Sequence, residues 1–134
     1  MAASRDVPSL DTTFLESLVP ENPAERVEFV DGLVVDCERA TTEAIESLRQ
    51  QCRSKDVEGI RYTAHSFRGA SSTLGAPRLV ELCRRLELQA PAGTWPELEG
   101  LVDEIHEEME IVNRSLHAFR REVEESNGPA GSRE

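Results

Sequence analysis

The sequence predicts an all-α protein, an antiparallel up-and-down four-helix bundle with a short extra helix near its N-terminus. Apolar residues recur at spacings of three and four along four segments, which is the period of an amphipathic helix. No segment alternates with the period of two that a half-buried strand requires, and no internal repeat is found. Capping and turn residues separate the segments, so short connections join neighbouring helices. The 134 residues suffice for one domain with a modest core.

The first two helices follow a polar N-terminal segment, residues 1–9, that we expect to be flexible. Residues 11–19 form a short helix that Pro20 ends. Asn22, followed by a proline at the first helical position and an acid three residues after the cap, marks the next helix start. An apolar stripe then predicts a long core helix that ends near Arg53. The stripe contains Val27, Val30, Val34, Cys37, Thr41, Ala44, Leu48 and Cys52.

Three further helices complete the bundle. Asp56 can cap the first of them, and Gly75 supplies its left-handed end. Pro77 begins the second, whose stripe contains Leu79, Leu82, Cys83, Leu86 and Ala90. After a break at residues 91–93, Thr94 starts a capping box for the longest helix. Its stripe contains Leu98, Val102, Ile105, Met109, Val112, Leu116, Phe119 and Val123. Residues 10–125 therefore form the bundle, and residues 126–134 are expected to be a flexible tail.

His65 lies on the open face of the helix between Asp56 and Gly75. The apolar stripe of that helix contains Ile60, Ala64, Phe67, Ser71 and Leu74. At 100° per residue, His65 lies about 140° from the centre of the stripe, so its ring points to water. A neutral imidazole is a nucleophile. An isolated exposed histidine is nevertheless most often a surface residue without a role, so its neighbours decide the interpretation.

The neighbours of His65 favour a functional site. Gly69 lies one turn further on and faces the same way, although glycine inside a helix costs about 1 kcal/mol relative to alanine. A missing side chain at this position makes sense if a partner must approach the imidazole closely. Arg68 and Ser72 flank the same face, and Arg68 places a cation beside the nucleophile.

The run from His65 to Ala76, His-Ser-Phe-Arg-Gly-Ala-Ser-Ser-Thr-Leu-Gly-Ala, followed by Leu79, Cys83, Leu86 and Glu87, resembles a histidine-containing phosphotransfer (HPt) domain. That family has a histidine, Lys-Gly three and four residues later, a small residue, a Leu-Gly-Ala turn, and a downstream Cys and Leu-Glu. The close match covers about 25 residues. Arg68 stands where the family usually has lysine, so the charge is kept but a planar fork replaces a point charge.

The resemblance implies a four-helix bundle that relays phosphoryl groups in two-component signalling. His65 would accept a phosphoryl group from an aspartate of one receiver domain and later give it to another, and Arg68 would stabilise the phosphoryl oxygens. Arg61, Gly69 and Ser72 would contact the partner. The receivers belong to response regulators or hybrid histidine kinases and would hold the magnesium, so no cofactor is expected here. The sequence has no glycine-rich nucleotide loop, and no independent kinase activity is expected.

The charge distribution is uneven. With 15 basic and 26 acidic residues the net charge is −11, which argues against nucleic acid or an anionic membrane as the main partner. Between residues 60 and 85, however, five arginines accompany a single acid, Glu81. Such a basic island around His65 suits a phosphoryl group or an acidic partner surface. The arginines are Arg61, Arg68, Arg78, Arg84 and Arg85.

We expect a cytoplasmic monomer. No apolar run approaches the roughly 20 residues of a membrane span, and the N-terminus lacks the apolar region of a signal peptide. Cys37, Cys52 and Cys83 lack the CxxC spacing and occupy core positions, as buried free thiols do in a reducing cytosol.

Other site chemistries fit less well. The segment 106–110 is similar to a zinc-binding helix, but Glu110 replaces the second histidine. His106 and His117 share a face but lie about 16 Å apart along it, so no metal site is predicted. The hydroxyls of residues 71–73 lack an oxyanion loop and an orienting aspartate, which argues against a hydrolase.

Two binding functions are the remaining alternatives. A metal- or ligand-binding bundle should place polar ligands in the apolar stripes, where only Thr41 and Ser71 are polar. The main alternative is therefore a four-helix adaptor that binds receiver or kinase domains without phosphotransfer. Such an adaptor would not need His65.

Overall fold

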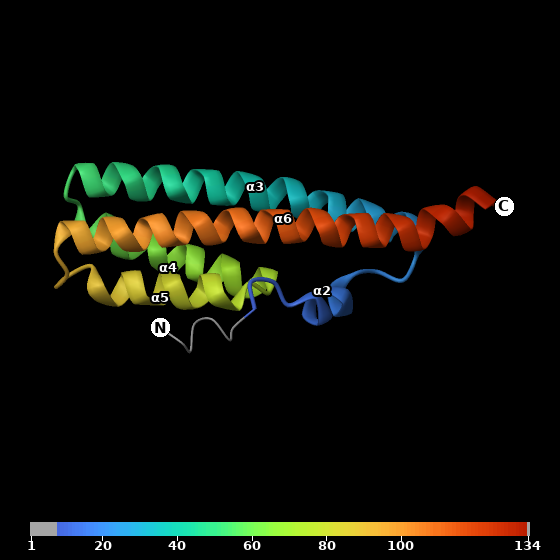
Figure 1. Cartoon of the computed structure of the whole chain (residues 1–134), viewed down its shortest axis with the longest axis horizontal. Coiled ribbons are helices and arrows are strands. Elements are labelled where there is room, and N and C mark those ends of the chain that lie inside the picture. Colours follow the sequence, from blue (N-terminus) through green and yellow to red (C-terminus); the bar gives the residue numbers. More distant parts are fainter. Residues whose placement is uncertain (1–7, 134) are drawn as a thin grey trace.

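A computed structural model describes the backbone of residues 8–133 and the side chains of residues 8–126. Within that part of the chain the structure is helical and contains no strand. The helices are α2 (Thr12–Leu18), α3 (Pro23–Arg53), α4 (Val57–Leu74), α5 (Pro77–Gln89) and α6 (Trp95–Arg133) (Figure 1). None of these helices combines the length and the apolar composition of a membrane span.

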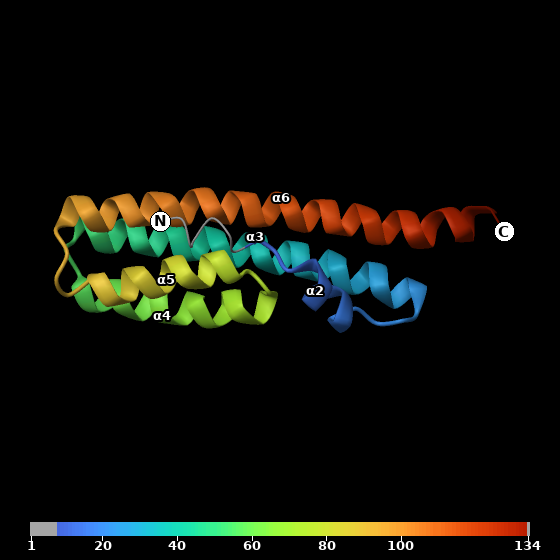
Figure 2. The ribbon, with the colours of Figure 1, turned by 60° about the horizontal axis from the view of Figure 1, so that its bottom comes forward.

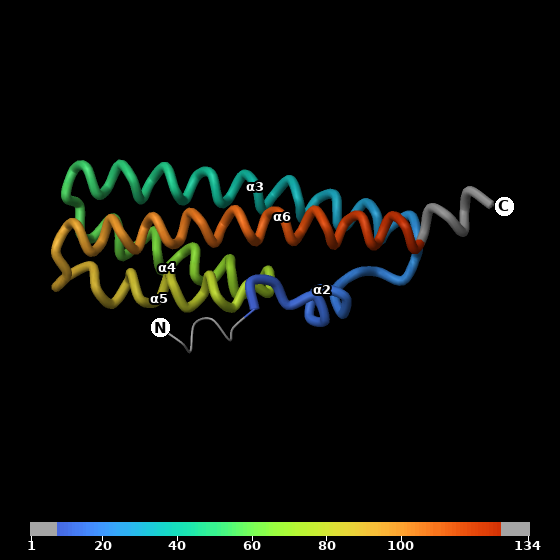
Figure 3. The backbone as a smooth tube through the Cα atoms, viewed as in Figure 1, coloured from blue at the N-terminus to red at the C-terminus, as the bar shows by residue number. Residues whose placement is uncertain are grey.

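The helices form the antiparallel bundle that the sequence predicts. The long helices α3 and α6 run in opposite directions side by side, and the shorter α4 and α5 form a second antiparallel pair along one half of them (Figures 1 and 2). The chain therefore runs alternately up and down through α3, α4, α5 and α6. The smooth trace in Figure 3 shows α2 beyond the α4–α5 turn, beside the half of α3 that the short pair leaves uncovered.

The predicted helix ends are confirmed by their hydrogen bonds. The side chain of Asn22 accepts from the backbone of Ala24 and Glu25, and that of Asp56 accepts from Gly59. Thr94 and Glu97 exchange the two bonds of a capping box. These side chains satisfy amide groups that the first turn of a helix leaves without partners.

The Gly75 turn holds α2 in place. Gly75 ends α4 in the left-handed region with a φ of 86°, and its carbonyl accepts a hydrogen bond from the amide of Asp11 at 2.8 Å. A Cβ at Gly75 would lie 2.7 Å from Cδ2 of Phe14 in α2, so any larger residue would collide with that ring. The short helix thus covers the end of the α4–α5 pair.

The predicted apolar stripes form one continuous core. Leu15, Val30, Leu48, Ile60, Leu79, Leu86 and Leu116 are among its fully buried side chains. All three cysteines are free and buried, as predicted. Burial is the main cause that raises the pKa of the Cys37 thiol to about 11 and that of Cys83 to about 12. Both thiols are therefore protonated and unreactive near neutral pH.

A buried ion pair is a feature that the stripes did not predict. Glu108 of α6 is 2 % exposed, and its Oε1 lies 3.1 Å from Nε of Arg78 in α5. The apolar stripes contain only Thr41 and Ser71 as polar residues, and the charge pattern of the sequence placed Arg78 among the cations around His65. Glu108 lies outside those stripes. The grouping of Arg78 with the cations around His65 was wrong, because Arg78 turns toward α6 and compensates the Glu108 carboxylate inside the core.

The C-terminal helix is longer than its apolar stripe. The backbone of α6 stays helical to Arg133, through Gly128 and Pro129, where the sequence predicts a tail. Proline has a φ that fits a helix, but at an interior position it removes one hydrogen bond and crowds the carbonyl four residues earlier, at a cost of about 3 kcal/mol. Residues 1–7 of the predicted flexible N-terminus lie outside the described residues. The division into flexible ends and a bundle at residues 10–125 stays a prediction.

Candidate functional site

His65 projects from the exposed face of α4, as its spacing predicted. The opposite face of the same helix is buried and contains Ile60, Ala64, Phe67 and Ser71. The hydroxyl of Ser71 donates to the carbonyl of Phe67 at 2.8 Å, so this core hydroxyl is satisfied and does not face His65. The side chain of His65 is 64 % exposed, which leaves the imidazole accessible to another protein.

A carboxylate and a guanidinium contact the imidazole. Oε2 of Glu87, on α5, lies 2.9 Å from Nδ1 of His65. Arg68, one turn after His65 on α4, places Nη2 3.2 Å from the same nitrogen and Nε 3.3 Å from Oε1 of Glu87. The Glu87 side chain is only 22 % exposed, because it lies in the seam between the two helices. The three side chains form one cluster across the α4–α5 seam.

These contacts assign the proton of the neutral imidazole. A carboxylate only accepts hydrogen bonds, so Nδ1 of His65 carries the proton and donates a hydrogen bond to Glu87. Arg68 is also only a donor, and in this tautomer it is held by its ion pair with Glu87 rather than by Nδ1. Nε2 of His65 keeps its lone pair, and no described residue donates to it. The exposed nitrogen of the ring is therefore the nucleophilic one.

The other predicted site residues line the same side of α4. Gly69 is exposed, and a Cβ built on it meets no atom within 4 Å, so the surface above it is open. Ser72 is exposed in the last turn. Arg61, one turn before His65, is exposed and pairs with Glu58 of its own helix at 3.3 Å.

The predicted basic island is smaller than the sequence indicated. Of its five arginines, only Arg68 contacts His65 in the described structure. Arg61 faces Glu58, and Arg78 is bound to Glu108 on the other side of α5. Glu87 partly neutralises Arg68, so the cluster around His65 is an ion-pair network rather than a patch of free positive charge.

Two residues beside His65 were not singled out as site residues. Glu87 appeared in the sequence only as part of a motif, because a contact over 22 positions depends on how α5 packs on α4. Tyr62, one turn before His65, is 74 % exposed. Its helical spacing could have placed it on the open face. An exposed tyrosine beside the imidazole adds contact area for a partner.

His117 has nearly the same local sequence as His65 but different contacts. It begins a His-x-Phe-Arg run in α6, as His65 does in α4. Its Nε2 lies 2.7 Å from Oε2 of Glu38, and its Nδ1 lies 3.3 Å from Nη2 of Arg120. Both ring nitrogens are therefore occupied, one as donor and one as acceptor, and the side chain is 35 % exposed. The residue one turn further on is Arg121, where the His65 site has Gly69.

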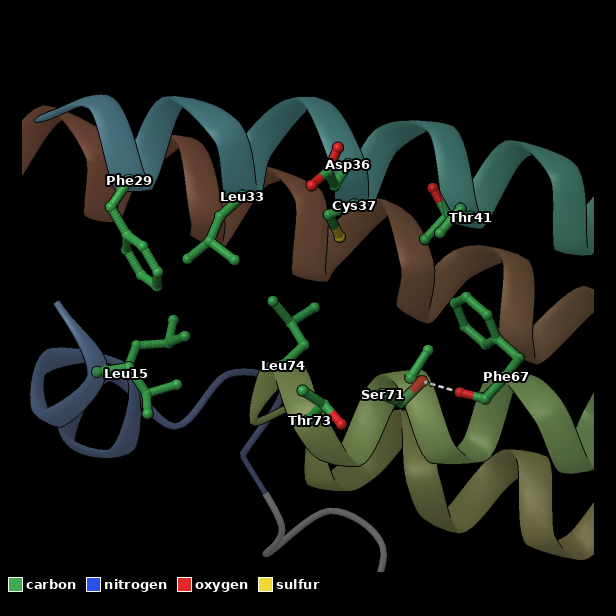
Figure 4. A pocket seen from close by; sticks show the side chains of 13 residues that line it. Leu15, Phe29, Leu33, Asp36, Cys37, Thr41, Phe67, Ser71, Thr73 and Leu74 are labelled. Carbon is green, nitrogen blue, oxygen red and sulfur yellow. Dashed lines mark hydrogen bonds between the residues drawn. The ribbon is translucent and has the colours of Figure 1, made fainter.

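An apolar groove of about 380 Å³ lies on the other side of α4, between α2, α3 and α4. Figure 4 shows Phe29 and Leu33 of α3 pointing across it toward Leu15 of α2. On α4 the lining includes Ala70 and Thr73, which lie within about two turns of His65. The groove gives apolar area to the side of α4 that faces α2 and α3.

No metal centre forms among the described side chains. Within residues 8–126, no three His, Cys, Asp or Glu side chains lie close enough together to bind an ion. His106 contacts Arg49 and Glu110, at 3.4 Å and 3.7 Å, and so belongs to a surface ion-pair network.

Residues 32–124 match the family model of the Hpt domain. Among solved structures, the chain is similar to the crystal structure of histidine-containing phosphotransfer protein B (HptB) from Pseudomonas aeruginosa PAO1. The two are 32 % identical with a TM-score of 0.70, over 86 % of this chain and 96 % of that chain. A search of curated proteins found no match. The family match includes His65, Arg68 and Glu87 and covers more than half of the chain. This chain belongs to the Hpt domain family, the histidine-containing phosphotransfer domains.

Proposed function

We propose that this protein relays phosphoryl groups between aspartates of receiver domains through Nε2 of His65. One observation carries this proposal: an exposed imidazole has its inner nitrogen bound to a carboxylate and its outer nitrogen free. Such an arrangement prepares a nucleophile in one orientation and one tautomer. Membership of the phosphotransfer family supports the same chemistry.

The transfer step needs no proton from the histidine. The lone pair of Nε2 attacks phosphorus of an aspartyl phosphate, a new N–P bond forms, and the P–O bond to the aspartate breaks. The aspartate leaves as a carboxylate with the bonding electrons. The ring becomes positively charged. Nδ1 keeps its proton and stays hydrogen-bonded to Glu87, whose carboxylate stabilises that charge. The reverse step delivers the phosphoryl group to a second aspartate.

The surrounding residues have separate roles in this proposal. Arg68 stabilises the phosphoryl oxygens from one turn along the helix. Gly69 leaves room for the partner, and Arg61 and Ser72 contact it on either side. Magnesium would belong to the receiver, whose aspartate it serves, and this chain would contribute no cofactor.

The apolar groove supports docking of the receiver. Ala70 and Thr73 lie between the His65 side of α4 and α3, so a receiver that reaches around α4 from His65 also covers the mouth of the groove. A helix of the receiver with an apolar face could bury this area, since helices commonly dock into apolar grooves.

The relay is tested by transfer of a radiolabelled phosphoryl group. A panel of receiver domains is charged with labelled acetyl phosphate and Mg²⁺, separated from free donor and mixed with the full chain. We expect label on this protein that is labile in acid and stable in base, as a phosphoramidate is. If no receiver transfers label although at least one binds, the relay is wrong and the protein is an adaptor.

Replacement of Gly69 by glutamine is expected to separate stability from function. The new side chain enters open space in the middle of a helix, so the variant should be more stable by about 0.5 kcal/mol. The same side chain obstructs the close approach of a receiver, and transfer should fall about tenfold. Thermal unfolding and initial transfer rates measure the two effects.

Gly100 offers a matched control for this prediction. It is also a helical glycine with open space around it, on α6 rather than at the site. Gly100→Gln should bring the same gain in stability and leave transfer unchanged. Equal transfer rates for the two variants would contradict a close approach over Gly69.

A further inference from the structure

We propose that Arg84 of α5 is a specificity-determining residue that attracts the acidic surface of the receiver. The inference rests on the proposed function, because it names the group that selects the partner of that same site. It concerns a residue that makes no contact with His65 in the described structure.

The contacts of Glu87 place Arg84 beside the site. Glu87 faces α4, where it meets His65 and Arg68. Arg84 precedes Glu87 by three residues and therefore lies on the same side of α5. Because α4 and α5 are antiparallel, one turn back on α5 corresponds to one turn forward on α4, from His65 toward Gly69.

The thiol of Cys83 provides a second observation on this register. Burial is the main cause that raises its pKa, Arg68 lowers it and Glu87 raises it further. The turn of α5 that carries residues 83–87 thus lies within electrostatic range of Arg68. Arg84 is the exposed member of this turn that carries a positive charge.

Arg84 is also a free cation. It is exposed, and it makes no ion pair or hydrogen bond with any residue that the structure describes. The other two cations near His65 are engaged, Arg61 by Glu58 and Arg68 by Glu87. On a protein with a net charge of −11, a free positive charge beside the site offsets repulsion from an anionic partner.

The partner that fits this charge is a receiver with an acidic rim. Its reacting group is an aspartyl phosphate, and a site that holds Mg²⁺ for it needs further carboxylates. Long-range attraction between Arg84 and these carboxylates would speed association and favour acidic receivers over neutral ones. Since Arg84 is exposed, its effect should decrease as salt is added.

Arg85 provides a matched control on the next position. It lies about 100° around α5 from Arg84. It shares the face of Arg78, which lies seven residues earlier and binds Glu108 of α6. Arg85 therefore points away from the α4 side. Changing either arginine to glutamate alters the net charge by the same amount, so the two variants differ in position and in exposure, Arg84 being exposed and Arg85 half-buried.

The test compares wild type, Arg84→Glu, Arg84→Lys and Arg85→Glu in transfer from a receiver charged with acetyl phosphate and Mg²⁺. We expect Arg84→Glu to raise KM about tenfold at low salt and less than twofold at 0.5 M NaCl, with kcat unchanged. Arg84→Lys should restore the wild-type KM, because a point charge is sufficient. Arg85→Glu should stay within about twofold of wild type.

Phosphoramidate, a small donor without a protein surface, separates docking from chemistry. It should phosphorylate the wild type and Arg84→Glu at equal rates. Equal KM values for Arg84→Glu and Arg85→Glu, or a change confined to kcat, would overturn the assignment of Arg84. Transfer to the wild type in the same experiment would still uphold the proposed function. If the wild type accepts no phosphoryl group from any charged receiver, the proposed function and this inference both fail.

Discussion

Replacement of His65 by glutamine is expected to abolish phosphoryl transfer, whereas the same replacement of His117 leaves it unchanged. Both histidines begin a His-x-Phe-Arg run and both lie beside an arginine and a glutamate. The pair of variants therefore tests the arrangement of the ring nitrogens rather than the local sequence.

The physical reason is which nitrogen the carboxylate binds. Glu87 binds Nδ1 of His65 and leaves Nε2 free, while Glu38 binds Nε2 of His117 and Arg120 contacts its Nδ1. Attack on phosphorus needs a lone pair, and of these two rings only that of His65 offers one without breaking a hydrogen bond. Glutamine keeps a polar side chain of similar length but has no nucleophilic nitrogen.

The measurement is the amount of acid-labile label that each purified variant takes from a charged receiver. Circular dichroism should show the same helical content for both variants, because neither ring lies in the core. Label that persists on His65→Gln and disappears from His117→Gln would contradict the assignment of the site.

Replacement of Glu87 by alanine is expected to lower the rate of transfer by roughly 10- to 100-fold without abolishing it. The carboxylate holds the imidazole in one tautomer and one orientation, and it stabilises the positive ring that the reaction forms. Without it, the proton can occupy Nε2, and Arg68 loses its ion-pair partner. Glu87→Gln keeps a hydrogen-bond acceptor but no charge, so its rate should lie between those of wild type and the alanine variant.

Glu81 supplies the control for charge. It lies six residues before Glu87, about 240° away around α5, so Glu81→Ala removes the same charge from another face. At saturating receiver, single-turnover transfer should be slower in Glu87→Ala than in Glu81→Ala. A transfer rate of Glu87→Ala equal to that of Glu81→Ala would show that Glu87 has no positioning role.

The helices and the exposure of His65 could be predicted because they depend on local sequence. Caps such as Asn22 and Thr94 act within three residues, and an apolar stripe requires only the helical period. The left-handed end of α4 at Gly75 depends only on the backbone freedom of glycine. These features depend on residues that lie close together in the chain, so a single sequence is sufficient to predict them.

Contacts between helices could not be predicted in the same way. The meeting of His65 with Glu87 depends on the register of α5 on α4, which no spacing in the sequence reveals. The same limit explains Glu108, which looks like one of many surface acids of α6 until Arg78 is seen beside it. His117 shows the limit most directly, because a nearly identical tetrapeptide leads to the opposite arrangement of the ring.

The buried pair of Glu108 and Arg78 allows α5 a single position along α6. A slip of one helical turn, about 5.4 Å, would leave the Glu108 carboxylate in the core without a cation, which is strongly unfavourable. Leucine side chains alone would tolerate such a slip far better, since one leucine resembles the next. The pair on one side of α5 thereby determines where Glu87, on its other side, meets the imidazole. The position of Glu87 against the His65 ring is thus set by a contact on the opposite side of α5, inside the bundle.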